Sequence, residues 1–242
     1  MRGSGPHASL GRRVVAEGVG TAFLLATVIG SGIMAERLAG GNVALALLAN
    51  TIATGAGLLA LILTFGGVSG AHFNPAVSVA DATQGGIAWR DVGAYVAVQL
   101  LGAFVGVALA HLMFDAPLFS ASRHVRSGFG QLAGEFVATF GLIAVIRGSS
   151  RAAPGMTPFA VAAYITAAYW FTSSTSFANP AVTLARAASD TFAGIRPSDA
   201  PGFIVAQALG AGSATLLFRW LIPAAPAAAN RLAIANDEEK VA

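Results

Sequence analysis

Long apolar stretches separated by short polar ones recur along the 242-residue chain. A helix of about 20 apolar residues crosses the roughly 30 Å hydrocarbon core of a bilayer. Six stretches meet this requirement, and the fifth is the shortest: 14–34, 43–65, 92–114, 129–147, 157–173 and 202–222. The pattern therefore predicts an all-α membrane protein with six transmembrane helices.

Two intermediate segments, 66–91 and 174–200, are too polar to span and too apolar for plain loops. Each contains the triplet Asn-Pro-Ala. Asn is a strong N-cap, and Pro fits the first helical position, where no backbone donor is needed. About ten helical residues follow, which cover roughly 15 Å, half of the hydrocarbon thickness. We predict two re-entrant half-helices that begin at these residues: Asn74, Pro75, Ala76 and Asn179, Pro180, Ala181.

The triplets belong to a wider internal repeat. Glu17 in the first apolar run matches Glu135 in the fourth, and Gln99 in the third matches Gln207 in the sixth. The halves, 10–115 and 125–222, each hold three spans, so the second half enters from the opposite side of the membrane. An inverted three-span repeat makes the N-termini of the two half-helices meet near the midplane.

Composition agrees with a membrane protein and excludes several function classes. The chain is 55% apolar and 10% charged, whereas soluble domains are about 25% charged. It has no cysteine and therefore no disulfide or thiolate metal site. The net charge of +3 is too small to indicate nucleic-acid binding. We expect no catalytic residues, no metal site and no cofactor.

Basic residues favour cytoplasmic N- and C-termini, because cytoplasmic loops carry an excess of Lys and Arg. Residues 223–242 are rich in Ala and Pro and end in a charged stretch, which predicts a disordered cytoplasmic tail. With the termini inside, nine basic residues lie inside and five outside: Arg2, Arg12, Arg13, Arg90, Arg147, Arg151, Arg219, Arg231 and Lys240 against Arg37, Arg123, Arg126, Arg186 and Arg196.

Two helix N-termini that face each other give the centre of the membrane a positive potential. Each terminus carries about half an elementary charge, and the amides of Asn74 and Asn179 add hydrogen-bond donors. A neutral polar molecule can accept these hydrogen bonds, whereas a cation meets a repulsive field without a replacement for its hydration shell. The pattern predicts a passive channel for small neutral solutes.

The motifs resemble those of the major intrinsic protein family, the aquaporins and aquaglyceroporins. The resemblance covers most of residues 10–222 and rests on Ser-Gly-Ala-His-Phe-Asn-Pro-Ala-Val at 69–77, on Phe-Ala-Asn-Pro-Ala-Val at 177–182 and on the paired glutamates. It implies a single channel domain over 1–222 and a homotetramer in the lipid bilayer with one pore in each subunit. Similarity to bacterial members implies the bacterial inner membrane.

One position departs from the family pattern. Most members have an arginine directly after the second Asn-Pro-Ala, where this chain has Val182. Counting without gaps places the other selectivity-filter positions at Thr54, Ala167 and Ser176. Similar bacterial members without the arginine are associated with arsenite permeation, so we expect metalloid hydroxides, glycerol-like polyols and water to pass. The alternatives are a water- or glycerol-selective channel and a proton-coupled secondary transporter.

Other polar residues have competing interpretations. Glu17 and Glu135 either hydrogen-bond to the re-entrant loops, which we favour, or relay protons. His72 either lines the pore or bonds to Glu17 and nearby backbone, and Phe171 is a candidate for the pore wall. Arg186, one helical turn after Val182, lies either at the outer mouth of the pore or in an ion pair at the surface or between helices.

Overall fold

The computed structural model describes residues 8–222, and the predicted disordered tail at 223–242 lies outside them. Every regular element in this range is a helix, which confirms the all-α prediction. The elements are α1 (Leu10–Leu38), α2 (Val43–Ser69), α3 (Pro75–Ala82), α4 (Trp89–Met113), α5 (Phe129–Ala152), the 3₁₀ turn η1 (Pro154–Met156), α6 (Thr157–Phe171), α7 (Pro180–Arg186) and α8 (Ala200–Leu221).

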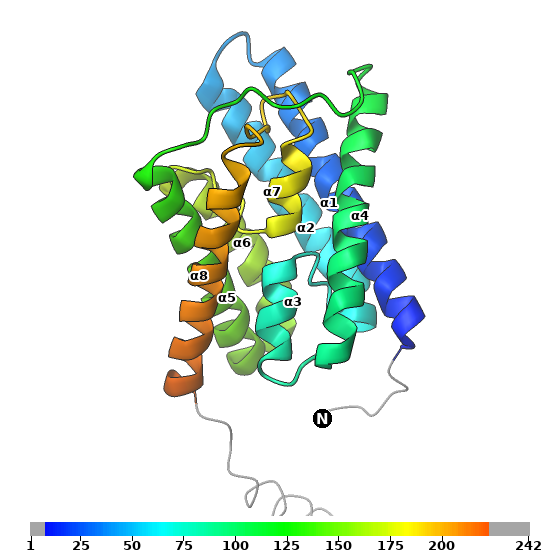
Figure 1. Ribbon diagram of the computed structural model, residues 1–242, viewed down its shortest axis with the longest axis vertical. Helices are drawn as coiled ribbons and strands as arrows, with labels where there is room; N and C mark the ends of the chain where they lie inside the picture. Colours follow the sequence, from blue (N-terminus) through cyan, green and yellow to red (C-terminus); the bar gives the residue numbers. More distant parts are fainter. Residues whose placement is uncertain (1–7, 223–242) are drawn as a thin grey trace, which may run out of the picture.

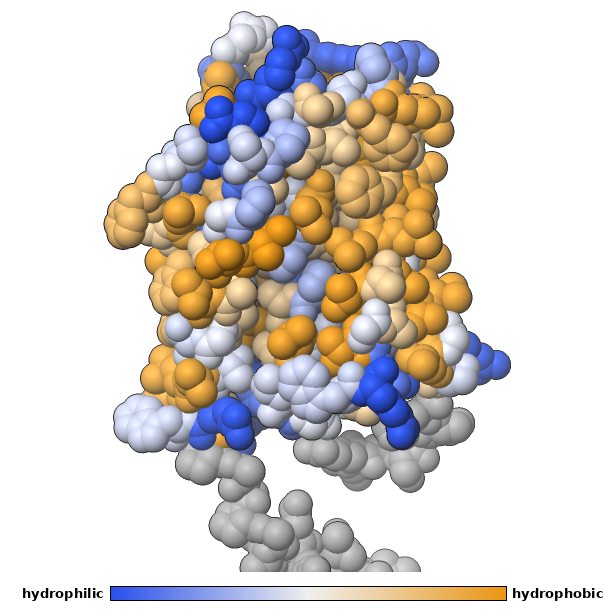
Figure 2. Space-filling model, in the orientation of Figure 1, coloured by the Kyte–Doolittle hydropathy of each residue, from blue (hydrophilic) through white to orange (hydrophobic). Residues whose placement is uncertain are grey.

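The six longer helices run roughly along the long axis of the molecule: α1, α2, α4, α5, α6 and α8 (Figure 1). The start of α1 and the end of α8 lie at the same end, which we call the terminal face; segment 114–128 crosses the opposite end, the loop face. A band of apolar side chains covers the middle of the visible surface, with hydrophilic residues gathered at both ends (Figure 2). This distribution matches a bilayer around the middle and water at the two faces.

Five of the helices, α1, α2, α4, α5 and α8, are long and apolar enough to cross a membrane alone. The sixth, α6, has 15 residues, a length of about 22 Å. Its N-terminal end follows η1 and has a proline within the first two positions, and its C-cap Thr172 is extended. The fifth predicted run is therefore helical but two residues shorter than 157–173.

The two halves of the chain pack by the same scheme. In the first half α1 contacts α2 and α4, and in the second half α5 contacts α6 and α8. Contacts between α2 and α6 join the halves. Each half-helix also packs on the last long helix of the other half, α3 on α8 and α7 on α4. The half-helices consequently fix the halves to each other.

Close contact between α1 and α4 depends on two glycines spaced four residues apart. A Cβ at Gly102 would overlap the carbonyl oxygen of Gly18, and one at Gly106 would overlap that of Ala22. The second half repeats the arrangement, since a Cβ at Gly210 of α8 would overlap the carbonyl oxygen of Phe136 in α5. Membrane helices use small residues in this way because apolar surface is not a driving force between helices in lipid.

Replacing Gly106 by leucine is expected to destabilise the fold by about 3 kcal/mol or more, because the obstacle includes backbone, which moves little. The matched control is Gly93→Leu on the same helix, where an added Cβ meets nothing within 4 Å. Thermal unfolding in detergent, followed by size-exclusion chromatography, measures both variants. Equal melting temperatures for the two variants would contradict the close-packing role.

Candidate functional site

A central cavity of about 510 Å³ passes through the middle of the molecule. Its lining includes Arg13 and Arg147 toward the terminal face, Asn74 and Asn179 of the two triplets, and Arg186 toward the loop face. Side chains from both halves line it, as do the two stretches of loop that precede the half-helices. The repeat thus encloses one continuous cavity at the place where its two copies meet.

The two asparagines join the half-helices end to end. The Oδ1 atom of Asn74 accepts from the backbone N–H of Ala76 at 2.9 Å, which caps α3. Its Nδ2 group donates to the carbonyl oxygen of Ala178 in the other half at 2.7 Å. Asn179 caps α7 in the same way, and its Nδ2 group donates to the carbonyl oxygen of Phe73 at 2.8 Å. A primary amide has two N–H donors, so each asparagine keeps one for the cavity that it lines.

The loops before the half-helices adopt an unusual backbone. Ala71 and Phe73 have φ of 49° each, and the matching residues Ser176 and Ala178 have φ of 52° and 49°. The left-handed region costs a residue with a side chain roughly 1–2 kcal/mol. Four such residues at the same two positions of each copy require strong compensating contacts.

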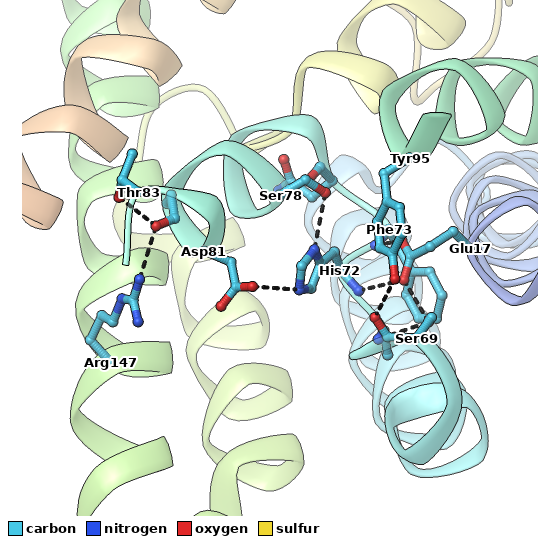
Figure 3. A network of polar contacts seen from close by, with 12 residues as sticks. Glu17, Ser69, His72, Phe73, Ser78, Asp81, Thr83, Tyr95 and Arg147 are labelled. Atoms are coloured by element: carbon cyan, nitrogen blue, oxygen red, sulfur yellow. Dashed lines mark hydrogen bonds and ion pairs between the residues drawn. The ribbon is translucent and has the colours of Figure 1, made fainter. Parts of the chain in front are cut away.

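Glu17 supplies those contacts in the first half (Figure 3). Its carboxylate accepts from the backbone N–H groups of His72 and Phe73 at 2.9 and 2.7 Å. It also accepts from the Ser69 hydroxyl at 2.6 Å and from the Gln99 amide at 2.8 Å. The carboxylate is fully buried and surrounded by donors, which is the arrangement in which a buried acid is best stabilised.

Glu135 repeats the arrangement in the second half. It accepts from the backbone N–H groups of Phe177 and Ala178 at 2.8 and 2.9 Å. The amide of Gln207 donates to Glu135 at 2.6 Å and to the Thr183 hydroxyl of α7 at 2.8 Å. Neither Glu17 nor Glu135 is among the residues that line the cavity. The geometry is that of two anchors for the loops.

His72 lies in the cavity wall between the loop and α3 (Figure 3). Its backbone N–H reaches Glu17, but its ring does not: Nδ1 is 3.1 Å from the Ser78 hydroxyl and Nε2 is 3.7 Å from an Asp81 carboxylate oxygen. The Arg147 guanidinium donates to the Ala80 carbonyl oxygen at 2.9 Å. Charged groups therefore surround the end of the cavity nearest the terminal face.

Three of the four residues predicted for the filter line the cavity together: Thr54, Ser176 and Val182. The prediction of Ala167 is wrong, because Ala167 lies on the exposed side of α6. Tyr169, two residues further along α6, lines the cavity, and its hydroxyl is 3.4 Å from that of Thr54.

The helical spacing of α6 could have identified Tyr169. Val161, Ile165 and Tyr169 are four residues apart, so they lie on one side of the helix, and all three line the cavity. Phe171, predicted for the pore wall, does not belong to this stripe. It is 55% exposed and packs against the ring of Tyr164.

Arg186 is buried and lines the cavity, with 2% of its surface exposed. Its Nε donates to the carbonyl oxygen of Ala193, and its guanidinium carbon lies 3.4 Å from the ring centre of Phe177. Within residues 8–222 no carboxylate pairs with it. The alternative of a surface or inter-helix ion pair is therefore wrong, and the charge is held by a carbonyl group and an aromatic face.

A second buried arginine, Arg126, was not predicted, because its sequence context is that of a solvated loop. Its Nε donates to the Gly194 carbonyl oxygen at 2.8 Å, and its guanidinium carbon is 5.1 Å from the ring centre of Phe177. Burial lowers the pKa of the Arg126 guanidinium to about 10, which leaves it charged at neutral pH. Two cations therefore share one aromatic ring beneath the loop face.

Residues 8–222 hold no group of three or more His, Asp or Glu side chains that could bind a metal ion. The histidines are separate: His72 lies in the cavity wall, and His111 bonds to the Ser189 hydroxyl at 2.8 Å. The hydroxyl, amide and guanidinium groups of the cavity lining can hydrogen-bond and carry charge.

Comparison with known proteins gives consistent matches. The family model described as Major intrinsic protein matches residues 6–163. Aquaglyceroporin AqpS of Rhizobium meliloti (strain 1021) is 56% identical over 218 residues, which cover 90% of this chain and 93% of that protein. The glycerol uptake facilitator protein of Bacillus subtilis (strain 168) is 30% identical over 129 residues, 47% of this chain and 46% of that protein. The X-ray structure of the aquaglyceroporin from Plasmodium falciparum superposes with a TM-score of 0.65 at 21% identity and covers 89% of this chain and 98% of that one.

Replacing Glu17 by glutamine is expected to destabilise the protein by about 3 kcal/mol. The carboxylate accepts hydrogen bonds from the surrounding N–H and O–H groups, whereas the NH₂ group of glutamine is itself a donor and would leave some of them without an acceptor. Solute flux should fall with it, since the loop that Glu17 holds lines the cavity. Glu36→Gln, an exposed acid on the same helix, is the control. Thermal unfolding and liposome flux measure both variants, and unchanged values for Glu17→Gln would refute the anchoring role.

Proposed function

Because the chain belongs to the major intrinsic protein family, we propose that its central cavity is a passive transmembrane pore for small neutral solutes. The family consists of channels and not of enzymes. One observation carries the assignment of the pore to this cavity: both asparagine-capped half-helices point their N-termini into it from opposite halves of the chain. The asparagines Asn74 and Asn179 mark the pore centre, together with Pro75, Ala76, Pro180 and Ala181.

The electrostatics of the pore favour neutral solutes over cations. The positive ends of α3 and α7 meet at the pore centre, and the buried charge of Arg186 lies further along the same cavity. A cation would pass both fields with few acceptors to replace its water. A neutral hydroxylated solute accepts from the free amide hydrogens and avoids this cost.

The filter, in our proposal, consists of Thr54, Tyr169, Ser176 and Val182. Three of these side chains carry hydroxyls, and each hydroxyl both donates and accepts. The Ser176 hydroxyl has no partner among the described residues. A compact solute with several hydroxyl groups fits such a wall, which supports glycerol-like polyols and uncharged metalloid hydroxides such as arsenous acid, with water also passing. The relatives include an aquaglyceroporin and a glycerol uptake facilitator, whose names agree with this class.

A proton-coupled transporter is the main alternative, since inverted repeats with broken helices also build transporters. Such a protein needs titrating groups in its transport path. Glu17 and Glu135 are fully buried, accept hydrogen bonds from the loops and do not line the cavity. The acid and the histidine that do line the cavity, Asp81 and His72, lie together near the terminal face. A proton relay needs titrating groups along the whole path, so this arrangement favours the channel.

In the membrane we propose that the terminal face is cytoplasmic, in the bacterial inner membrane. Arg13, Arg90, Arg147 and Arg151 lie on helix ends at this face, as the rule for basic cytoplasmic segments expects. We also propose a homotetramer with one pore in each subunit. Several large apolar side chains of α2 are exposed along its length, which leaves surface for neighbouring subunits as well as lipid.

Stopped-flow swelling of proteoliposomes tests the pore and its filter. The wild-type protein should pass water, glycerol and arsenous acid. Val182→Arg should reduce glycerol and arsenous acid flux roughly tenfold, which corresponds to about 1.4 kcal/mol of added barrier, and should reduce water flux less, because the larger side chain narrows the opening. Val125→Arg, on an exposed position of segment 114–128, is the control. Passage of water alone by the wild type would refute the solute assignment.

Arg186 is the second group to test. Arg186→Gln should increase leakage of monovalent cations into liposomes loaded with a cation-sensitive dye, because it removes the buried positive charge. Arg186→Lys should exclude cations as the wild type does, since the lysine ammonium restores the positive charge although it lacks the planar guanidinium. Arg123→Gln removes a charge of the loop face whose side chain is 90% exposed, and it serves as control. If Arg186→Gln folds and matches the wild type in both cation leak and solute flux, Arg186 has no role in selectivity.

A further inference from the structure

A second hollow lies between α3 and α8, separate from the pore. It has a volume of about 460 Å³ and is almost entirely apolar. The helices α3 and α8 contact each other and lie side by side on the side of the molecule toward the viewer in Figure 1. Its wall consists of Pro75, Ala76, Val79, Ala80, Thr83, Pro180, Ala208, Ala211, Gly212, Thr215, Leu216 and Arg219. We call it the α3–α8 groove.

The α3–α8 groove extends over one half of the membrane. One end is formed by Pro75 and Pro180, the first residues of α3 and α7, directly behind the pore-centre asparagines. The other end is formed by Arg219, in the last turn of α8 at the terminal face. From Ala208 to Arg219 the helix rises about 16 Å, close to half of the roughly 30 Å hydrocarbon core. The length is that of one lipid leaflet.

The walls of the groove are open because small residues of α8 line it. A Cβ placed on Gly212 would meet nothing within 4 Å. Val79 and Leu216, both exposed, form its apolar rims. Arg219 is exposed, and no carboxylate within residues 8–222 pairs with it. The exposed indole of Trp220 follows it, a residue type typical of the boundary between hydrocarbon and headgroups.

We propose that the α3–α8 groove binds one acyl chain of an anionic phospholipid from the leaflet at the terminal face. The chain lies along Ala208, Ala211 and Gly212, its end reaches the two prolines, and the phosphate group pairs with Arg219. The match in length, the apolar wall and the single cation at the headgroup end each fit this occupant. A second copy of the protein would have to insert a side chain into the groove and supply its own anion for Arg219.

Native mass spectrometry of the full-length protein in detergent, titrated with phosphatidylglycerol or phosphatidylcholine, tests the site. The wild type should bind a first phosphatidylglycerol more tightly than phosphatidylcholine. Gly212→Leu combined with Ala208→Leu fills the groove and should abolish this first binding event. Arg219→Gln should keep chain binding and lose the preference for phosphatidylglycerol by about fivefold, the factor expected for one basic residue beside an anionic lipid.

Two control variants change equivalent residues elsewhere. Gly93→Leu adds the same side chain at an open position of α4, and Arg151→Gln removes a charge at the terminal end of α5. Both should bind lipid like the wild type, and melting temperatures verify that every variant is folded. Unchanged binding by the folded groove-filled variant would overturn the proposal. Loss of first-lipid binding when the oligomer dissociates would also overturn it, because a second copy would then take part in the site. Stronger lipid binding by a chain that ends at Ile222 would overturn it too, because the following segment would then be the occupant of the groove.

Discussion

The structure depends on two buried carboxylates that hold backbone in a conformation it would otherwise avoid. The first re-entrant loop places two non-glycine residues in the left-handed region and the second places three, at roughly 1–2 kcal/mol each. Each loop also lies at a depth where no bulk water can satisfy its N–H groups. Glu17 and Glu135 satisfy two consecutive N–H groups in each loop, and Gln99 and Gln207 connect the same carboxylates to the half-helices. The asparagines can then meet at the centre.

An acid inside a membrane can either anchor a loop or relay protons, and the position of the two glutamates distinguishes these roles. A proton relay needs a carboxylate that changes its charge in contact with the transport path. Glu17 and Glu135 lie behind the loops, outside the cavity lining, and their oxygens are surrounded by donors. The charge stabilises the geometry, and the loops present the asparagines to the solute. The same physical element therefore stabilises the fold and keeps both intramembrane glutamates out of the cavity wall.

The proposed selectivity filter lies at a different level of the cavity, nearer the loop face. Val182 removes one charge from the position directly after the second triplet, but a charge remains one turn further on at Arg186. That guanidinium lies against Phe177 and bonds to a backbone carbonyl, so it is fixed in place. Arg126 approaches the same ring from segment 114–128. In the proposed function, hydroxyl groups contact the solute while a displaced positive charge opposes cations.

The sequence by itself determined the architecture. The apolar runs, the two Asn-Pro-Ala triplets and the matched Glu and Gln residues are local patterns repeated in register, and each has a direct physical meaning for a chain in lipid. The tertiary structure decided what depends on angles and distances between elements. Ala167 was predicted to line the cavity, but Tyr169 lines it instead. The rotation of α6 about its axis decides which residues face the cavity, and that rotation follows from packing and not from residue counting. The burial of Arg126 and the α3–α8 groove arise where distant segments meet, and no local pattern in a single sequence records such a contact.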